Sequence, residues 1–267
     1  FHTWAPDVYE GAPTPVTAFL SVASKTAGFV ALLALVFVGF YGRADVWEPL
    51  VWVLSAASMT VGNLVALRQT NMVRLMAYSG VAQTGFMIAP LAVAGHSVAT
   101  GDQALSATVT YLAIYAAMNL GAFAVVITLA RRTGSAEISS YAGAFHYAPG
   151  LTLAMTAFLF SLAGIPPLGG WFAKFEVFRV LATAGEPWGY VLAVVAAVNS
   201  VIALFYYAAI ARRMWAEDVP DGDLSPVSVT PSLVSALALC GIVTLAFGVA
   251  PQAVARFTNV SLLALGG

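Results

Sequence analysis

The sequence predicts an all-α fold: a polytopic membrane helix bundle of about seven transmembrane helices, one of them discontinuous near residues 164–170. Three observations predict it. The 267 residues are 60% hydrophobic and only 9% charged, whereas an ordinary soluble domain has roughly 25% charged residues. Apolar segments long enough to cross ~30 Å of hydrocarbon recur along the chain. One of these segments is interrupted by prolines and glycines. We expect residues 1–267 to form a single membrane domain.

The chain begins in a polar segment. Residues 1–15 contain Pro6, Pro13, Pro15 and Gly11, and this composition predicts a loop. Because the first residue is not methionine and no signal peptide is visible, we interpret the chain as the C-terminal part of a longer protein. Seven crossings follow, each apolar and bounded by turn or charged residues. They are expected at residues 16–41, 47–68, 72–95, 105–130, 149–184, 188–214 and 230–250.

The fifth crossing contains an interruption on which the functional interpretation depends. Pro166 and Pro167 lack backbone donors and clash with the preceding turn, while Gly169 and Gly170 let the chain bend. Irregular backbone persists inside a bilayer only where it is buried in protein or lines a water-filled cavity. The interruption therefore predicts a polar path, with Lys174 beside it.

Arginine positions predict the orientation. If the loops alternate, six arginines lie near one side and three near the other, so the first set is expected in the cytoplasm. The first set is Arg68, Arg74, Arg131, Arg132, Arg212 and Arg213, and the second is Arg43, Arg179 and Arg256. We expect a multi-pass protein of the cell (inner) membrane whose first residues are cytoplasmic and whose C-terminus is outside.

The only two lysines of the chain, Lys25 and Lys174, both lie inside predicted spans. Lys25 is ~15 Å along its helix and Lys174 is ~18 Å from the end of its own, so both are near the membrane midplane. An amine there costs ~3 kcal/mol or more, and its protonation responds to small changes in nearby charge. We interpret both lysines as proton carriers. The alternatives are a static buried ion pair and snorkelling to an interface.

Other polar residues inside the spans are candidates for the path, although most are expected to be hydrogen bonds between helices. Tyr111, Tyr115 and Asn119 share one helix face at a spacing of four. Glu176 is expected to pair locally with Arg179. The remaining candidates are Ser21, Ser24, Thr26, Asn63, Gln83, Asn199, Ser200, Tyr206 and Tyr207.

Several other classes of site are not expected. A net charge of -1 provides no electrostatic basis for nucleic-acid binding. The single cysteine, Cys240, excludes a disulfide within the chain and is expected to be a small buried apolar residue. His2, His96 and His146 are far apart in predicted loops, so no metal site is expected. No phosphate-binding loop, flavin site or quinone site is visible.

Three segments of the sequence resemble a known family, the antiporter-like membrane subunits of respiratory complex I, and among them subunit N of NADH-quinone oxidoreductase. They are HTWAPDVYEGAPTPVTAFLSVASK at 2–25, GNLVALRQTNMVRLMAYSGVAQTGF at 62–86 and SLAGIPPLGGWFAKF at 161–175. The resemblance implies a fold of 14 helices with two inverted repeats of five, each with one discontinuous helix. This chain would hold helices 8 to 14 of that fold.

The resemblance also implies roles for individual residues. Lys25 and Lys174 match two members of a line of ionisable groups along the membrane midplane, while a glutamate and a lysine of earlier helices would precede Phe1. The chain departs from the family pattern at Val73, where a lysine is frequent, and at Gln83, where a histidine is frequent. The resemblance therefore implies no role in proton relay for Val73 or Gln83.

The resemblance implies a translocase whose redox chemistry lies elsewhere. NADH, FMN, iron–sulfur clusters and quinone would be bound by partner subunits, with no cofactor in this chain, and the partners would be other membrane subunits of the same complex. Two other interpretations remain open. The chain could belong to a multisubunit Na+/H+ antiporter or a hydrogenase-linked membrane complex, or it could be a structural subunit that conducts nothing.

Overall fold

A computed structural model describes residues 2–259, and every regular element within that range is helical. The α-helices are α1 (Trp4–Gly11), α2 (Thr14–Phe19), α3 (Lys25–Ala34), α4 (Ala44–Ala66), α5 (Met72–Ile88), α6 (Val98–Thr133), α7 (Ala144–Tyr147), α8 (Pro149–Ala163), α9 (Gly169–Thr183), α10 (Pro187–Ala216), α11 (Pro231–Val249) and α12 (Pro251–Thr258). The π-helical turn Leu20–Ser24 joins α2 and α3, and a second π-helical turn, Leu35–Gly39, continues α3. Short 3-10 turns lie at Tyr41–Arg43, Ala89–Val93 and Ile138–Tyr141.

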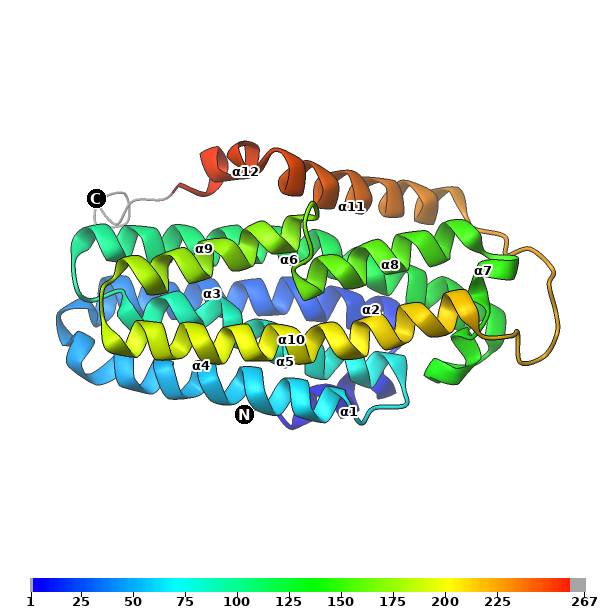
Figure 1. Ribbon diagram of the computed structural model, residues 1–267, viewed down its shortest axis with the longest axis horizontal. Coiled ribbons are helices and arrows are strands. Elements are labelled where there is room, and N and C mark those ends of the chain that lie inside the picture. The colour runs from blue at the N-terminus through cyan, green and yellow to red at the C-terminus, as the bar shows by residue number, and fades with distance from the viewer. Residues whose placement is uncertain (1, 260–267) are drawn as a thin grey trace.

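Six helical segments are long and apolar enough to cross a membrane: Thr14–Gly39, Tyr41–Ala66, Met72–Val93, Val98–Thr133, Pro187–Ala216 and Pro231–Val249. The helices α8 and α9, of 15 residues each, follow one another end to end and together make a seventh crossing (Figure 1). Neither would span ~30 Å of hydrocarbon alone, at ~1.5 Å per residue. The predicted fold class, with seven crossings and one discontinuous helix, is confirmed.

The helices lie nearly parallel to the long axis of the molecule, so their connections gather at two ends (Figure 1). At one end, Arg74 of α5 pairs with Asp7 and Glu10 of α1 at 2.6 and 2.8 Å. At the same end, Arg132 of α6 pairs with Asp223 of the long connection to α11 at 2.9 Å. These contacts show that the arginine-rich connections lie together, as the alternating pattern predicts.

The centre of the bundle is formed by α5 and α6. In the apolar part of these spans 83% and 78% of the residues are buried, against 11% for α11 on the flank. A transmembrane helix that is buried on all sides has no contact with lipid. Polar side chains on α5 and α6 therefore contact other parts of the protein.

Two parts of the sequence-based prediction are wrong at the level of elements. Residues 1–15, expected to be a loop, contain α1 and the first turn of α2. Pro6 is tolerated because it lies in the first turn of α1, where the missing amide would have no helical partner. The short helix α12 was not predicted either.

The interruption between α8 and α9 also differs in detail from its prediction. It consists of residues 164–168, and Gly169 and Gly170 are the first residues of α9 and not the bend. The residue that turns the chain is Gly164, whose φ of 94° lies in the left-handed region that favours glycine. Gly170 serves a different purpose, because a Cβ atom there would lie 1.7 Å from the carbonyl oxygen of Ser161.

Candidate functional site

Lys25 is the first residue of α3 and follows the π-helical turn Leu20–Ser24 directly. It lies close to the middle of the 26-residue span Thr14–Gly39. Its amine donates to the carbonyl oxygen of Gly80 at 2.8 Å and to the hydroxyl of Tyr115 at 3.2 Å. The same amine lies 4.5 Å from the centre of the Tyr115 ring, where a cation is attracted by the face of the ring.

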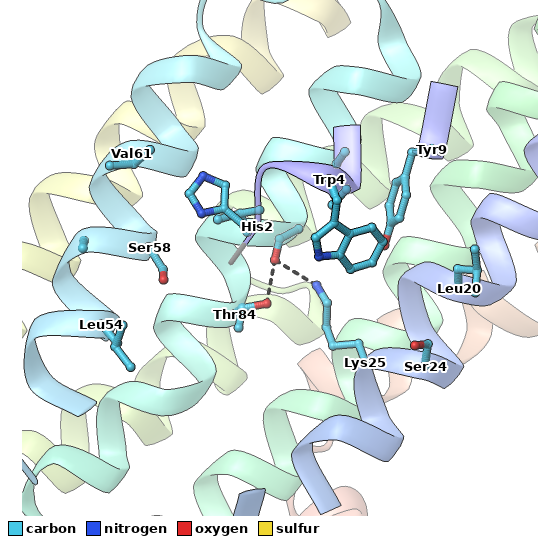
Figure 2. A pocket seen from close by; sticks show the side chains of 15 residues that line it. His2, Trp4, Tyr9, Leu20, Ser24, Lys25, Leu54, Ser58, Val61 and Thr84 are labelled. Carbon is cyan, nitrogen blue, oxygen red and sulfur yellow. Dashed lines mark hydrogen bonds between the residues drawn. The ribbon is translucent and has the colours of Figure 1, made fainter. Parts of the chain in front are cut away.

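A pocket of about 460 Å³ adjoins this amine. Figure 2 shows Lys25 extending from α3 toward α5, with Trp4 and Tyr9 of α1 on one side and Ser58 of α4 on the other. The hydroxyl of Thr84 donates to the same Gly80 carbonyl that Lys25 contacts, at 2.9 Å. Burial raises the pKa of Tyr9 to about 12, so its phenol stays protonated well above neutral pH.

Lys174 is the sixth residue of α9 and only 4% of it is exposed. Its amine donates to the carbonyl oxygen of Ala163 at 2.8 Å and to the hydroxyl of Ser200 in α10 at 3.3 Å. It also lies 4.5 Å from the centre of the Phe86 ring. The two lysines therefore have the same kind of environment: one main-chain carbonyl, one hydroxyl and one aromatic face.

The interrupted crossing contributes directly to the Lys174 site. A helix that ends inside a bundle leaves its last carbonyls without helical partners. Two of these carbonyls accept from side chains: Ala163 from Lys174, and Leu162 from the amide of Gln83 at 3.0 Å. Gly164 lets the lysine approach, because a Cβ atom at this glycine would lie 2.8 Å from Cδ of Lys174.

Gln83 of α5 is the centre of a buried hydrogen-bond network. Its side-chain carbonyl accepts from the hydroxyl of Tyr111 in α6 at 2.6 Å, and its amide lies 3.4 Å from the hydroxyl of Tyr207 in α10. The hydroxyls of Tyr207 and Ser79 are 2.5 Å apart. Because Gln83 also contacts Leu162, four elements meet at this one side chain: α5, α6, α8 and α10.

The two lysine environments meet on α5 and α6. From α5, Gly80 contacts Lys25 while Gln83 contacts the carbonyl next to the one that binds Lys174. From α6, Tyr115 contacts Lys25, and Tyr111, one turn earlier, contacts Gln83. Tyr111, Tyr115 and Asn119, which were predicted to share one helix face, are all buried, and Asn119 donates to Ser21 at 2.8 Å.

Among the described residues, neither Lys25 nor Lys174 is neutralised by an ion pair. The ion pairs formed among the described residues involve arginine and histidine side chains and do not include Lys25 or Lys174. A charged amine in this position is stabilised by carbonyl and hydroxyl dipoles and by ring faces. Such a site lacks the fixed counter-charge that would hold a proton permanently.

Other predicted residues take structural roles. Glu176 and Arg179 form the expected local pair at 2.5 Å. Asn63 donates to Asn199 at 3.0 Å and accepts from Tyr206 at 3.1 Å, which joins α4 to α10. Cys240 is half-buried, so its prediction as a buried residue is wrong. The reason is that α11, which carries it, packs on one side only.

Sequence reasoning missed the residues that organise the site. Gly80, Ser79 and Phe86 contact the lysines or their neighbours, but they are ordinary components of a membrane helix in the sequence. Gly164 could have been recognised, because a glycine that follows an apolar helical run and precedes two prolines is a typical helix terminus. The π-helical turn before Lys25 has no sequence signal of this kind.

The chain is similar to known proteins along most of its length. The family described as "NADH:quinone oxidoreductase/Mrp antiporter, TM" matches residues 1–200. A relative from Chloroflexus aggregans, named NADH-quinone oxidoreductase subunit N, is 40% identical over 268 residues, which cover 100% of this chain and 53% of the relative. The chain spans about half the length of the curated relatives it matches.

Solved structures show the same fold. A chain of respiratory complex I from Thermus thermophilus with bound aureothin matches with a TM-score of 0.74 and 33% identity, over 96% of this chain and 54% of that one. A chain of the Mrp complex from Dietzia sp. DQ12-45-1b matches with a TM-score of 0.86 and 22% identity, over 99% of this chain and 55% of that one. The second likeness concerns the fold alone. This multi-pass membrane chain therefore belongs to the NADH:quinone oxidoreductase/Mrp antiporter family.

Proposed function

We propose that this chain forms half of a proton channel in a membrane subunit of a proton-pumping NADH:quinone oxidoreductase. The observation that carries the proposal is the contact between Lys174 and Ala163, in which a mid-membrane amine binds a carbonyl released by the broken helix at 2.8 Å. A main-chain carbonyl and a titratable side chain are thus in contact inside a membrane-spanning segment. Intramembrane groups of this kind are typical of proton pathways.

In this proposal Lys25 is the central carrier and Lys174 is the carrier toward a neighbouring subunit or the exit. Each amine gains or loses a proton as the charge of its neighbours changes. The hydroxyls of Tyr115 and Ser200, together with the carbonyls of Gly80 and Ala163, orient the two amines. Pro166 and Pro167, with Gly169 and Gly170 at the start of α9, keep the interruption open to water.

The environment of Gln83 supports a lateral direction of transfer. An amide does not titrate, so Gln83 holds Tyr111, Tyr207 and Leu162 in place and does not carry a proton itself. Proton movement between the lysines then depends on water and tyrosine hydroxyls along α5 and α6. Redox chemistry belongs to partner subunits that bind NADH, FMN, iron–sulfur clusters and quinone, next to other membrane subunits of the complex.

The test is substitution in the full-length protein within its assembled complex, reconstituted into vesicles. Lys25→Ala and Lys174→Ala should each reduce proton pumping about tenfold or more, equivalent to about 1.4 kcal/mol or more on the limiting barrier. Lys174→Arg keeps the charge but cannot release the proton, so it should also fail. Arg68→Ala, at an exposed arginine of a connection, is the control.

Assembly of each variant is checked by native electrophoresis, and quinone reduction is measured beside pumping. If both alanine variants assemble and retain pumping and quinone reduction, the relay assignment is wrong. If Lys174→Arg pumps normally, a fixed positive charge is sufficient and Lys174 is not a carrier.

A second candidate is a subunit of a sodium/proton antiporter. The observation behind this candidate is the likeness in fold to a chain of the Dietzia Mrp complex, with a TM-score of 0.86. Purification of the native complex distinguishes the two candidates. Flavin and iron–sulfur subunits in the complex support the oxidoreductase, and a complex of membrane subunits alone that exchanges sodium for protons supports the antiporter.

A further inference from the structure

A second pocket, remote from the lysines, lies where α6 ends and α11 begins. Its volume is about 360 Å³, and Arg131 and Arg132 of α6 line it together with residues 225–228, Thr230 and Leu233. Both helices are membrane spans, so the pocket is at the level where a span leaves the hydrocarbon. This is the depth of lipid headgroups in a bilayer.

The two arginines supply positive charge to this pocket. Arg131 is exposed and takes part in no ion pair among the described residues. Arg132 is paired with Asp223 at 2.9 Å through one terminal nitrogen, while its Nε atom is buried and has no hydrogen-bond partner. Among the described residues, Asp223 is the acidic partner within ion-pair distance of these two arginines, and Asp221 lines an adjacent cavity with Arg132. The Nε donor of Arg132 remains unused.

Hydroxyl groups and a helix terminus complete the polar wall. Thr128, Ser225, Ser228 and Thr230 line the same pocket. Thr230 precedes the first turn of α11, so the positive end of the dipole of a 19-residue helix adjoins the pocket. Guanidinium and hydroxyl groups together recognise a phosphate oxygen.

An apolar groove adjoins the polar pocket across the segment that contains Val227. This groove has a volume of about 520 Å³ and is lined by residues of α8, α11 and the segment between α10 and α11, among them Leu151, Ala154, Val229 and Leu237. Beyond it, α11 presents exposed apolar side chains such as Leu239 and Ile242, each 65% exposed. Val227 lines both cavities, so a ligand with a polar head and an apolar chain can occupy the two together.

We propose that this paired cavity binds an anionic glycerophospholipid, with its phosphate between Arg131 and Arg132 and an acyl chain in the groove between α8 and α11. Charge complementarity selects an anionic headgroup over a zwitterionic one. The apolar groove selects a lipid over a free phosphate. The bound lipid would join the end of α6 to the flanking helix α11, which buries few of its own residues.

The experiment measures lipid binding to the full-length protein, purified in detergent and delipidated, by native mass spectrometry. The probes are phosphatidylglycerol, phosphatidylcholine with the same chains, and inorganic phosphate. We expect phosphatidylglycerol to bind more tightly than either of the others. Arg131→Gln should weaken its binding about fivefold, the equivalent of ~1 kcal/mol for one basic residue at a membrane surface.

The control is Arg68→Gln, because Arg68 is also exposed, belongs to no ion pair among the described residues and lies at the same end of the bundle. It should leave binding unchanged. Size-exclusion profiles of both variants report folding. Equal binding of the two lipids, binding of inorganic phosphate as tight as that of phosphatidylglycerol, or an Arg131→Gln variant that binds like the wild type would each overturn the proposal.

Discussion

At the residue scale, the two lysines owe their properties to neighbours that are neutral. Each amine contacts a carbonyl, a hydroxyl and a ring face, and this pattern recurs at two places separated by the central helices α5 and α6. Neutral dipoles stabilise a cation without fixing its charge. A carboxylate at the same distance would hold the proton more firmly. The arrangement is consistent with amines whose protonation responds to their surroundings.

Substitution of Tyr111 tests the network at this scale. Tyr111→Phe removes the donor to Gln83 at 2.6 Å and leaves a buried acceptor unpaired. We expect the full-length protein to lose about 0.6 kcal/mol of unfolding free energy, the average measured for hydrogen bonds between membrane helices, and at most about 1.7 kcal/mol. Denaturation in mixed micelles measures this free energy of unfolding. Tyr190→Phe, at a tyrosine that is 50% exposed, should have no effect; equal stability of the two variants would contradict the role assigned to Tyr111.

At the element scale, the interruption between α8 and α9 is held by close backbone contacts. Gly170 of α9 contacts Ser161 of α8, whose hydroxyl accepts from the Gly170 amide at 3.0 Å. On the other side, Gly248 of α11 lies so close to the interruption that a Cβ atom there would lie 1.8 Å from the carbonyl oxygen of Pro167. Trp171 donates to the Gly248 carbonyl at 3.2 Å. Thus α11 packs against one side of the irregular segment, while Pro166 and Pro167 remain exposed.

Gly170→Ala tests this packing. The added methyl group would overlap a main-chain oxygen that cannot move without shifting α8, so we expect a loss of about 1–3 kcal/mol of stability and a displaced Lys174. Thermal unfolding and proton pumping in vesicles are the measurements. Gly241→Ala is the matched control, because this glycine of α11 has no atom within 4 Å of an added Cβ. Similar stability losses in both variants would show that the contact with Ser161 is unimportant.

At the scale of the whole molecule, the seven crossings place the arginine-rich connections at one end and the connections after α3, α5 and α9 at the other (Figure 1). The order of the helices alone determines which connections share an end. It does not determine which end faces the cytoplasm, and that assignment depends on the unequal numbers of arginines.

Labelling of single cysteines tests the orientation. In a Cys240→Ser background, Ser139→Cys and Ala99→Cys introduce thiols at exposed positions of opposite ends. A membrane-impermeant maleimide added to intact cells should label Ala99→Cys, and it should label Ser139→Cys only after the cells are opened. The reverse pattern would mean that the arginine-rich end faces outward.

Much of this architecture follows from the sequence, because hydrophobic length is a local property. A run of about 20 apolar residues specifies a crossing wherever it packs. Two prolines beside glycines specify an interruption, and a lysine ten residues into a crossing is at the midplane whatever its neighbours are. The number and approximate positions of the spans and the discontinuous helix were therefore predictable, and the midplane depth of Lys25 and Lys174 stays a prediction. The helix α1 was not, because its polar residues are stabilised by Arg74, which is distant in sequence.

The groups that contact the two amines depend on the tertiary structure. The carbonyl of Gly80 and the hydroxyls of Tyr115 and Ser200 are separated from their lysines by 55, 90 and 26 residues. Nothing in the local sequence specifies such contacts, since they depend on how helices rotate and pack against one another. The sequence alone shows that Lys25 and Lys174 lie inside apolar spans, and that Lys174 follows an interruption. Packing determined that both are held by neutral dipoles, because the partners come from helices distant along the chain.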